Sequence, residues 1–263
     1  MVIIHSLTIQ INEIITYIKE QYNTIDSIDA LANHFGYSPF YFSRAFKKET
    51  GFSIKQFISS LKMEASINNL VIKNNSVLAS HLKAGFLSAT TFSKNFEKQT
   101  GVTPKQYQKS LKRLYAFMKD YEQIEKVSHS HYEKPAKQEL NSQCIVTLDY
   151  PSYYKGGVSF IGLFKHPIPN HRPIVGKAVV GSQICVLDNI PPGNYYLLAC
   201  SIEKNGRLSD YFVLNKALRC KIDDEIAFPK QNMAIFNLNF REALPEDPPI
   251  NINLPKLLFD DLK

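Results

Sequence analysis

Long hydrophobic runs are missing from this 263-residue sequence. No stretch approaches eighteen consecutive apolar residues, and the N-terminus has no basic segment followed by an apolar one. Export and membrane spanning are therefore not expected. We expect a cytoplasmic protein without a membrane partner, and one long enough for two domains that each bury a core.

Patterned cysteines and histidines are also scarce. Four cysteines are present, none in C-x-x-C spacing: Cys144, Cys185, Cys200 and Cys220. Buried reduced thiols are the favoured interpretation, and a disulfide between neighbouring strands is the alternative. His129 and His131 flank a serine in a polar segment that we interpret as a solvated linker rather than as a metal site. His166 and His171, in a proline-rich loop, are interpreted in the same way, so no metal or other cofactor is expected.

Catalytic motifs are absent as well. The sequence has no G-x-S-x-G, no P-loop, no H-E-x-x-H and no cysteine beside a histidine. Nucleophilic and metal-assisted catalysis depend on such arrangements. An enzyme is therefore not expected.

What the sequence has in excess is positive charge in one half. Residues 1–120 hold 15 Lys and Arg against 8 Asp and Glu, a difference of +7, whereas residues 121–263 hold 16 against 16, a difference of zero. A basic part joined to a neutral part suggests that the basic part meets a polyanion.

The basic half contains an internal repeat. Residues 42–51 read FSRAFKKETG and residues 92–101 read FSKNFEKQTG. The comparison of 42–62 with 92–112 gives 11 identities in 21 positions. A pattern that occurs only twice, fifty residues apart, predicts two copies of one small module rather than a solenoid.

The first copy predicts a helix-turn-helix unit. Ser27 can cap a short helix, Gly36 supplies a left-handed turn, and Ser38-Pro39 starts a second helix. Phe42 and Phe46 form the buried stripe of that second helix, which leaves a basic outer face. A short helix, a turn with glycine and a second helix are the parts of a helix-turn-helix.

The second copy repeats this plan around Gly85, with a helix from about 88 to 99. One long helix over about 53–73 joins the units, and an amphipathic helix over 8–23 precedes them. The motifs GYSPFYFSRAFKKETGFSIKQFI and GFLSATTFSKNFEKQTGVTPKQY carry the repeat. With them, the sequence from about 8 to 113 resembles the DNA-binding domain of the AraC/XylS family of bacterial transcription regulators.

The resemblance implies which residues contact DNA. Bases would be contacted from the two recognition helices by Phe40, Ser43, Arg44, Ala89, Thr90, Thr91, Ser93 and Lys94. Phosphates would be contacted by Lys47, Lys48, Ser53, Lys55, Lys98, Thr103 and Lys105. Arg44 suits guanine O6 and N7, and the helix starts at Ser53 and Thr103 suit phosphates. Two such helices would enter successive major grooves, about 34 Å apart along the duplex.

Ser80 and His81 depart from the family pattern. They correspond to Leu31 and Ala32 of the first unit, where the family has an aliphatic residue followed by Ala. A polar pair at a tight helix contact is expected to loosen the second unit or to shift its first helix. Because the second recognition helix also lacks Arg, the first unit is expected to be the stronger base reader.

The sequence after residue 142 predicts strands. Seven apolar runs separated by turn residues read CIVTLDY, VSFIGLF, PIVGKAVV, QICVLD, YYLLACSI, YFVLNKAL and AIFNLNF. They predict an antiparallel sandwich or a small barrel. The segment LDNIPPGNYYLLA resembles the closing hairpin of transthyretin-like or Cna-B-like sandwiches, and the proline-rich end is expected to cross the sandwich as an extended tail. Six aromatic residues are interpreted as core, with a ligand pocket as the alternative: Tyr153, Tyr154, Phe160, Tyr195, Tyr196 and Tyr211.

We therefore expect a multi-domain α plus β protein. An all-α tandem helix-turn-helix domain is expected over 1–118, with its units at about 8–63 and 64–113. A linker over 119–142 and an antiparallel β-sandwich over 143–263 would follow.

The expected function is transcription regulation, with activation as the default, through double-stranded DNA and RNA polymerase. The sandwich would be a sensory or oligomerisation domain, for a small-molecule effector or a homodimer. The alternative is a ligand-binding, carbohydrate-binding or enzymatic sandwich protein in which DNA binding is secondary.

Overall fold

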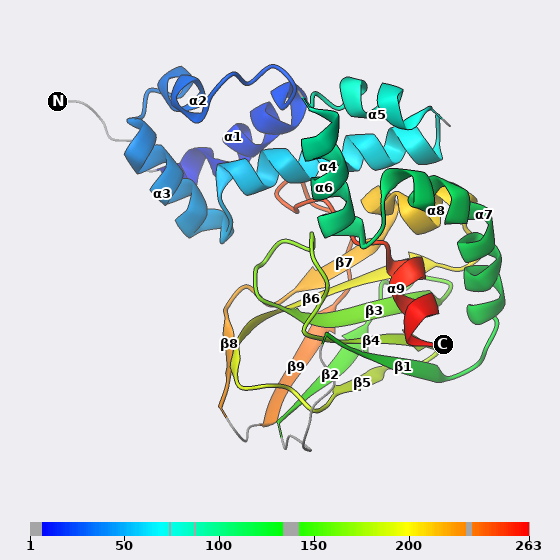
Figure 1. Ribbon diagram of the computed structural model, residues 1–263. Coiled ribbons are helices and arrows are strands. Elements are labelled where there is room, and N and C mark those ends of the chain that lie inside the picture. The colour runs from blue at the N-terminus through cyan, green and yellow to red at the C-terminus, as the bar shows by residue number, and fades with distance from the viewer. Residues whose placement is uncertain (1–6, 74, 87, 134–141, 230–232, 263) are drawn as a thin grey trace.

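A computed structural model describes residues 7–73, 75–86, 88–133, 142–229 and 233–262 (Figure 1). Its N-terminal half is helical: α1 (Leu7–Gln21), α2 (Ile28–His34), α3 (Pro39–Thr50), α4 (Ile54–Val71), α5 (Val77–Lys83), α6 (Ala89–Thr100) and α7 (Pro104–Tyr121). In Figure 1, α1 to α6 lie above the β domain and α7 runs down beside it. No helix in the described part of the chain is both long and apolar enough to cross a membrane.

The first helix-turn-helix unit surrounds an aromatic core. Phe42 and Phe46, one turn apart on α3, are fully buried against Phe57 of α4 and Ile14 of α1. Each such ring stabilises the fold by about 1.5–3 kcal/mol relative to exposure to water. The i,i+4 stripe that the sequence predicts is therefore confirmed.

The core of the second unit is shared with the β domain. Phe92 and Phe96 of α6 belong to the same buried cluster as Phe212 and Ile250 of the C-terminal half. Tyr107 of α7 contacts Phe212 edge to face, with 5.9 Å between ring centroids. The helical half and the β domain are thus packed on each other through a common apolar core.

A buried carboxylate fixes the end of α7 to the β domain. Glu122, only 4% exposed, accepts hydrogen bonds from the Tyr211 hydroxyl, from the Lys119 ammonium and from the backbone N–H of Asn205, the last at 3.1 Å. Burial and the neighbouring Glu122 raise the pKa of Tyr211. This network joins helix α7 to the segment that follows the longest strand of the β domain.

The β domain consists of two sheets packed face to face. Its strands are β1 (Val127–Tyr132), β2 (Gln143–Asp149), β3 (Gly157–Phe164), β4 (Val175–Val180), β5 (Ile184–Leu187), β6 (Gly193–Glu203), β7 (Leu218–Lys221), β8 (Ile226–Phe228) and β9 (Met233–Asn239). The larger sheet has the order β1-β4-β3-β6-β7, with β8 paired to β6, and the smaller sheet has the order β5-β2-β9. The core between them includes Val146, Leu163, Leu197 and Leu238.

The other face of the larger sheet is also covered. Helices α8 (Leu208–Phe212) and α9 (Leu254–Asp261) and the C-terminal tail pack there, over Phe160, Leu198 and Cys200. A sheet that is buried on both faces needs apolar residues at consecutive positions. This double burial explains why β3 reads as the unbroken run VSFIGLF rather than as an alternating pattern.

The β domain differs from the sequence-based expectation in its pairing. Strands β2 and β9 run parallel, so the sandwich is mainly but not wholly antiparallel. Strands β5 and β6 belong to different sheets. The prediction of a closing hairpin for LDNIPPGNYYLLA is therefore wrong, since this segment crosses from one sheet to the other.

Two expected extended segments are helical. The run YFVLNKAL was predicted to be a strand, but it contains the end of α8 and a 3-10 turn over Leu214–Lys216. The Arg207 N–H donates to the Asp210 carboxylate at 2.8 Å, which satisfies a backbone group that the start of a helix leaves free. The C-terminal tail ends in α9, where Asn253 accepts from the Lys256 N–H at 3.1 Å.

Part of the expected linker over 119–142 is regular structure. Helix α7 continues to Tyr121, and β1 pairs antiparallel with β4, with His131 opposite Gly176. His129 and His131 therefore lie in a sheet rather than in solvent. Strand β1 reads VSHSHY, with polar residues at four consecutive positions. It therefore lacks the alternation of apolar and polar residues that usually indicates a strand. Residues 134–141 lie outside the described part of the chain.

The cysteines match the favoured interpretation. All four are free thiols; Cys144, Cys185 and Cys200 are buried, and Cys220 is half-buried. Burial raises the pKa of Cys200 to about 12. The thiols in the core are therefore protonated at neutral pH.

Candidate nucleic-acid interface

The two recognition helices, α3 and α6, bury equivalent residues and expose equivalent faces. Phe42 and Phe46 on α3 and Phe92 and Phe96 on α6 are each at most 1% exposed. Every residue that the sequence predicts to contact bases lies on the outer side. Exposed are Phe40, Arg44, Ala89, Thr90, Thr91 and Lys94, and half-buried are Ser43 and Ser93.

Phe40 is the most unusual of these side chains. It is 77% exposed at the second position of α3, although an aromatic ring of this size gains most from burial. Arg44 lies one turn further along the same helix and is also exposed. An apolar ring and a guanidinium that share one exposed face suit a groove that presents thymine methyl groups and guanine acceptors.

Hydrogen bonds at the helix starts hold both recognition helices and the helices that follow them. Ser38 accepts from the Tyr41 N–H and Ser88 accepts from the Thr91 N–H, both at 3.4 Å. Ser53 and Thr103 form reciprocal capping boxes with the glutamines three residues later. The predicted N-caps are confirmed, and they fix the orientation of each recognition helix.

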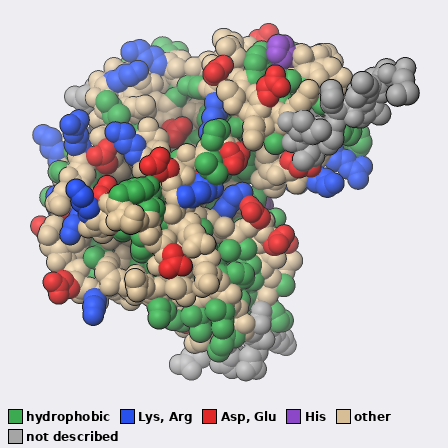
Figure 2. Space-filling view, turned by 180° about the vertical axis from the view of Figure 1, so that it is seen from behind, with side chains coloured by type: hydrophobic (Ala, Val, Ile, Leu, Met, Phe, Trp, Pro, Cys, Tyr) green, Lys and Arg blue, Asp and Glu red, His purple; other side chains and the backbone are tan. Residues whose placement is uncertain are grey.

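The predicted phosphate-contacting residues surround these helix ends. Lys47, Lys48 and Lys98 are exposed in the last turns of α3 and α6, and Lys55 and Lys105 are exposed in the first turns of α4 and α7. Ser53 and Thr103 are half-buried, since their side chains serve as caps. Figure 2 shows Lys and Arg side chains distributed over the helical part as seen from behind, whereas hydrophobic side chains gather at the far end of the β domain.

The polar pair of the second unit occupies a buried position. Ser80 is 0% exposed and donates to the Ser76 carbonyl at 3.0 Å within α5. His81 is 5% exposed, has no hydrogen-bond partner on either ring nitrogen, and packs on Phe92 with 5.7 Å between centroids. Helix α5 nonetheless has the same length as α2 in the first unit. The departure therefore leaves an unsatisfied group in the core without shortening the helix.

The helical region is similar to known helix-turn-helix proteins. Residues 31–110, which include both recognition helices, match a family described as a helix-turn-helix domain. The multiple antibiotic resistance protein MarA of Salmonella typhimurium and of Escherichia coli is 34% identical over 83 residues. The helical half of this chain is therefore similar to helix-turn-helix proteins of this kind. The alignment covers 32% of this chain, and this chain spans only 65% of the length of these curated relatives.

Two solved structures align with about two-fifths of this chain. The C-terminal domain of AraT, a response regulator from Geobacillus stearothermophilus, aligns over 38% of this chain and 84% of its own, at 26% identity and a TM-score of 0.36. The DNA-binding domain of AdpA, solved in complex with a target DNA, aligns over 39% of this chain and 93% of its own, at 21% identity and a TM-score of 0.37.

A loop of the β domain reaches the ends of both recognition helices. This β3–β4 loop comprises residues 165–174. Its Ile168 is fully buried in the core of the first unit. A methyl group on Gly51, at the end of α3, would lie 2.7 Å from Pro167, and one on Gly101, at the end of α6, would lie 3.1 Å from the Arg172 guanidinium. Both glycines have a φ near +80°, as the left-handed end of a helix requires.

The C-terminal tail contacts the helical units at a neighbouring point. The Asn251 amide, 1% exposed, donates to the Ser60 hydroxyl of α4 at 2.8 Å and to Gln99 of α6 at 3.0 Å. The Asn251 N–H donates to the carbonyl of Pro169, in the β3–β4 loop, at 3.1 Å. The loop and the tail thus form one contact region, which we call the clamp (residues 165–174 and 250–252).

The sequence carried little signal for the clamp. The β3–β4 loop reads KHPIPNHRPI, and its prolines and histidines are typical of a solvated loop. Only Ile168, an apolar residue between two prolines, indicates in the sequence that part of this loop is buried. The clamp also changes the environment of His171, because burial and the nearby His166, Lys165 and Lys98 lower its pKa to about 4.

The remaining candidates separate into core and pocket. Tyr195 and Tyr211 are buried in the core and Tyr153 is exposed, whereas Phe160 lines a pocket described below.

Within the described residues, no three His, Cys, Asp or Glu side chains are grouped so that they could hold a metal ion. His131 is hydrogen-bonded to Asp261 and His129 to Tyr121.

Proposed function

We propose that the protein is a DNA-binding transcription regulator whose two recognition helices read successive major grooves. The observation that carries the proposal is the repeated surface of α3 and α6. Each helix buries its pair of phenylalanines and leaves fully or partly exposed the residues at which AraC/XylS-type domains are expected to contact bases. The excess of positive charge in residues 1–120 supports the same partner.

In this proposal the protein acts in the cytoplasm and activates transcription by holding RNA polymerase near a promoter. Activation is the usual mode of the family, and it requires the protein to contact DNA and polymerase together. No catalytic step is assigned to the chain.

We further propose that the β domain sets the distance and angle between the two recognition helices. Two helices on one chain can read two grooves only when their separation matches the duplex repeat of about 34 Å. The clamp touches the end of α3 through Pro167 and the end of α6 through Arg172 and Asn251. A shift of the clamp would therefore move one reader relative to the other.

The test is the salt dependence of duplex binding by the full-length protein. Each lysine that contacts a phosphate steepens the fall of log K with log salt by about 0.9. Lys48→Ala and Lys98→Ala should weaken binding to all sequences about equally and each flatten this slope by about one unit. Lys155→Ala, which changes an exposed lysine of the β domain just before β3, is the matched control and should leave the slope unchanged. Binding that does not change with salt would contradict the proposal.

A further inference from the structure

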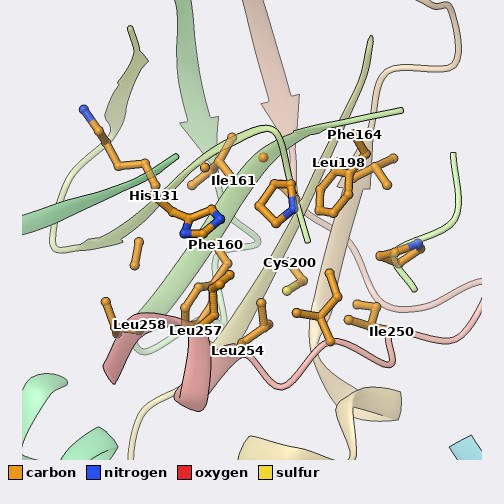
Figure 3. Close-up of a pocket in the computed structure, with 18 of the residues that line it drawn as sticks. His131, Phe160, Ile161, Phe164, Leu198, Cys200, Ile250, Leu254, Leu257 and Leu258 are labelled. Atoms are coloured by element: carbon orange, nitrogen blue, oxygen red, sulfur yellow. The ribbon is translucent and has the colours of Figure 1, made fainter. Parts of the chain in front are cut away.

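A pocket lies between the larger sheet and the C-terminal tail. One wall is formed by Phe160, Leu198 and Cys200 of β3 and β6, and the opposite wall by Ile250, Ile252, Leu254, Leu257 and Leu258. Figure 3 shows these side chains converging on a common space, with the His131 ring among them. We call this space the sheet pocket; its cavity is about 60 Å³, whereas one water molecule needs about 10–15 Å³.

His131 brings an unsatisfied polar atom into these apolar surroundings. The side chain is 7% exposed, and its Nδ1 lies 2.9 and 3.0 Å from the two carboxylate oxygens of Asp261 on α9. Its Nε2 is buried and has no hydrogen-bond partner. An unpartnered buried nitrogen costs about 1–3 kcal/mol. A water molecule needs two to four polar partners. The other polar side chains of the lining are already engaged: His129 with Tyr121, Lys177 with Asp188 and Asp261 with His131 itself.

The partner of Nδ1 defines what Nε2 can bind. A carboxylate only accepts, so the Nδ1 atom carries a proton. Nε2 is then an acceptor when the ring is neutral and a donor when the ring is protonated. A hydroxyl group satisfies it in both states, because it can donate and accept. A carboxylate ligand would satisfy only the protonated ring, and it would bring a second negative charge to the ring that already pairs with Asp261.

We propose that the sheet pocket binds a small apolar alcohol, phenols included, whose hydroxyl hydrogen-bonds to His131 Nε2. Phe160, Leu198 and Leu257 would bury its apolar part. Asp261, which also lines the pocket, acts as a positioning residue, since both of its carboxylate oxygens lie within hydrogen-bond distance of Nδ1 and orient the ring.

The wall of the pocket is continuous with the clamp. Along the extended tail, Ile250 and Ile252 face the pocket, and Asn251 between them faces the helical half, where it bonds Ser60 and Gln99. Pro169 also lines the pocket, next to Ile168, which is buried in the first unit. A ligand that moves this wall therefore moves the contacts to both helix-turn-helix units. This step rests on the proposed function: the ligand would change the affinity of the protein for DNA, and DNA would change the affinity for the ligand by the same factor.

Calorimetric titration of the full-length protein with three matched probes tests the site without DNA. The probes are phenol, toluene (a methyl group in place of the hydroxyl) and benzoate (a carboxylate in its place). Phenol should bind saturably and about tenfold more tightly than either of the others, since one hydrogen bond to an otherwise unpaired buried group is worth roughly that factor. Equal affinity for phenol and toluene, or tighter binding of benzoate, would overturn the proposal.

Two variants locate the binding. His131→Leu should remove the preference for phenol over toluene while toluene still binds, and Ile250→Trp, which fills the pocket, should abolish binding of both. His34→Leu changes an exposed histidine of α2, outside both the pocket and the clamp, and is the control. A preference for phenol that survives His131→Leu, in protein that melts cooperatively, would place the ligand elsewhere. The comparison of phenol with toluene on the unmodified protein needs no variant and remains decisive if His131→Leu does not fold.

The effect of phenol on DNA affinity is measured in a separate experiment. Phenol at saturation should change the duplex affinity of the wild type at least threefold and leave that of Ile250→Trp unchanged. If phenol binds at His131 and the protein binds DNA, but phenol leaves the duplex affinity unchanged, the proposed coupling between pocket and DNA is wrong. If the protein binds no DNA, the proposed function fails, while the ligand site is still decided by calorimetry.

Discussion

The Asn251 amide donates a hydrogen bond to Gln99 Oε1 across 3.0 Å, and this bond joins the C-terminal tail to the second recognition helix. Both residues are buried, at 1% and 8% exposure. Because the same amide also reaches Ser60 on α4, a single side chain of the tail contacts a recognition helix and the long helix that joins the two units.

Replacing Asn251 by Leu should lower both stability and DNA affinity. The change leaves Gln99 and Ser60 with lost partners in a buried place, which costs about 1–3 kcal/mol of the free energy of unfolding. Urea unfolding measures this, and Asn237→Leu, at an exposed position of β9, is the control. Asn251→Leu should also weaken binding to duplexes that hold both half-sites, and it should weaken binding to duplexes with one half-site by less. An unaltered unfolding free energy would mean that the clamp does not hold the helical units.

Replacing His81 by Leu should stabilise the protein. The ring is 5% exposed and neither nitrogen has a partner, so an apolar side chain of similar size removes an unpaired polar group from beside Phe92. The expected gain is about 1–3 kcal/mol. Ser80→Ala is the matched comparison. It should change stability little, because the Ser80 hydroxyl makes only a local hydrogen bond, to the Ser76 carbonyl one turn earlier. If His81→Leu melts below the wild type, its ring makes contacts that outweigh the unpaired nitrogens.

The stability of the protein should fall in mild acid partly through His171. Burial lowers its pKa in the folded state to about 4, against about 6.5 in an unfolded chain. Between these values the unfolded chain binds a proton that the folded protein does not, so stability falls as pH drops from about 6.5 toward 4. Relative to the wild type, His171→Gln should therefore be more stable at pH 4.5 than at pH 7. His34→Gln, on the surface of α2, is the control; the same difference at both pH values would contradict the assignment.

Most of the helical half could be predicted because local chemistry determines it. Ser38, Ser53, Ser88 and Thr103 accept bonds from the backbone N–H groups three residues later, and the sequence alone indicates such caps. The buried phenylalanines repeat at helical spacing. Each position predicted to contact bases lies on the face opposite that stripe.

The C-terminal half was harder to predict because its structure depends on distant partners. β1 is polar in sequence and becomes a strand only because β4 pairs with it. YFVLNKAL is apolar throughout, and a run of this length does not distinguish a strand from a buried helix. The clamp depends on contacts across 191 and 152 residues, from Asn251 to Ser60 and to Gln99. Periodicity and turn residues carry no information at that range.

Selection of duplexes from a random pool by the full-length protein tests the central claim most directly. Two readers on one chain predict two short enriched motifs with centres about one helical turn, 10–10.5 base pairs, apart. Arg44→Ala should lose about 1–3 kcal/mol of preference at one base pair of one motif only, and Lys94→Ala should weaken only the other motif. Arg113→Ala, whose guanidinium lies over Phe259 of α9, should leave both motifs intact. A single motif, or motifs that Arg44→Ala and Lys94→Ala leave unchanged, would contradict the account.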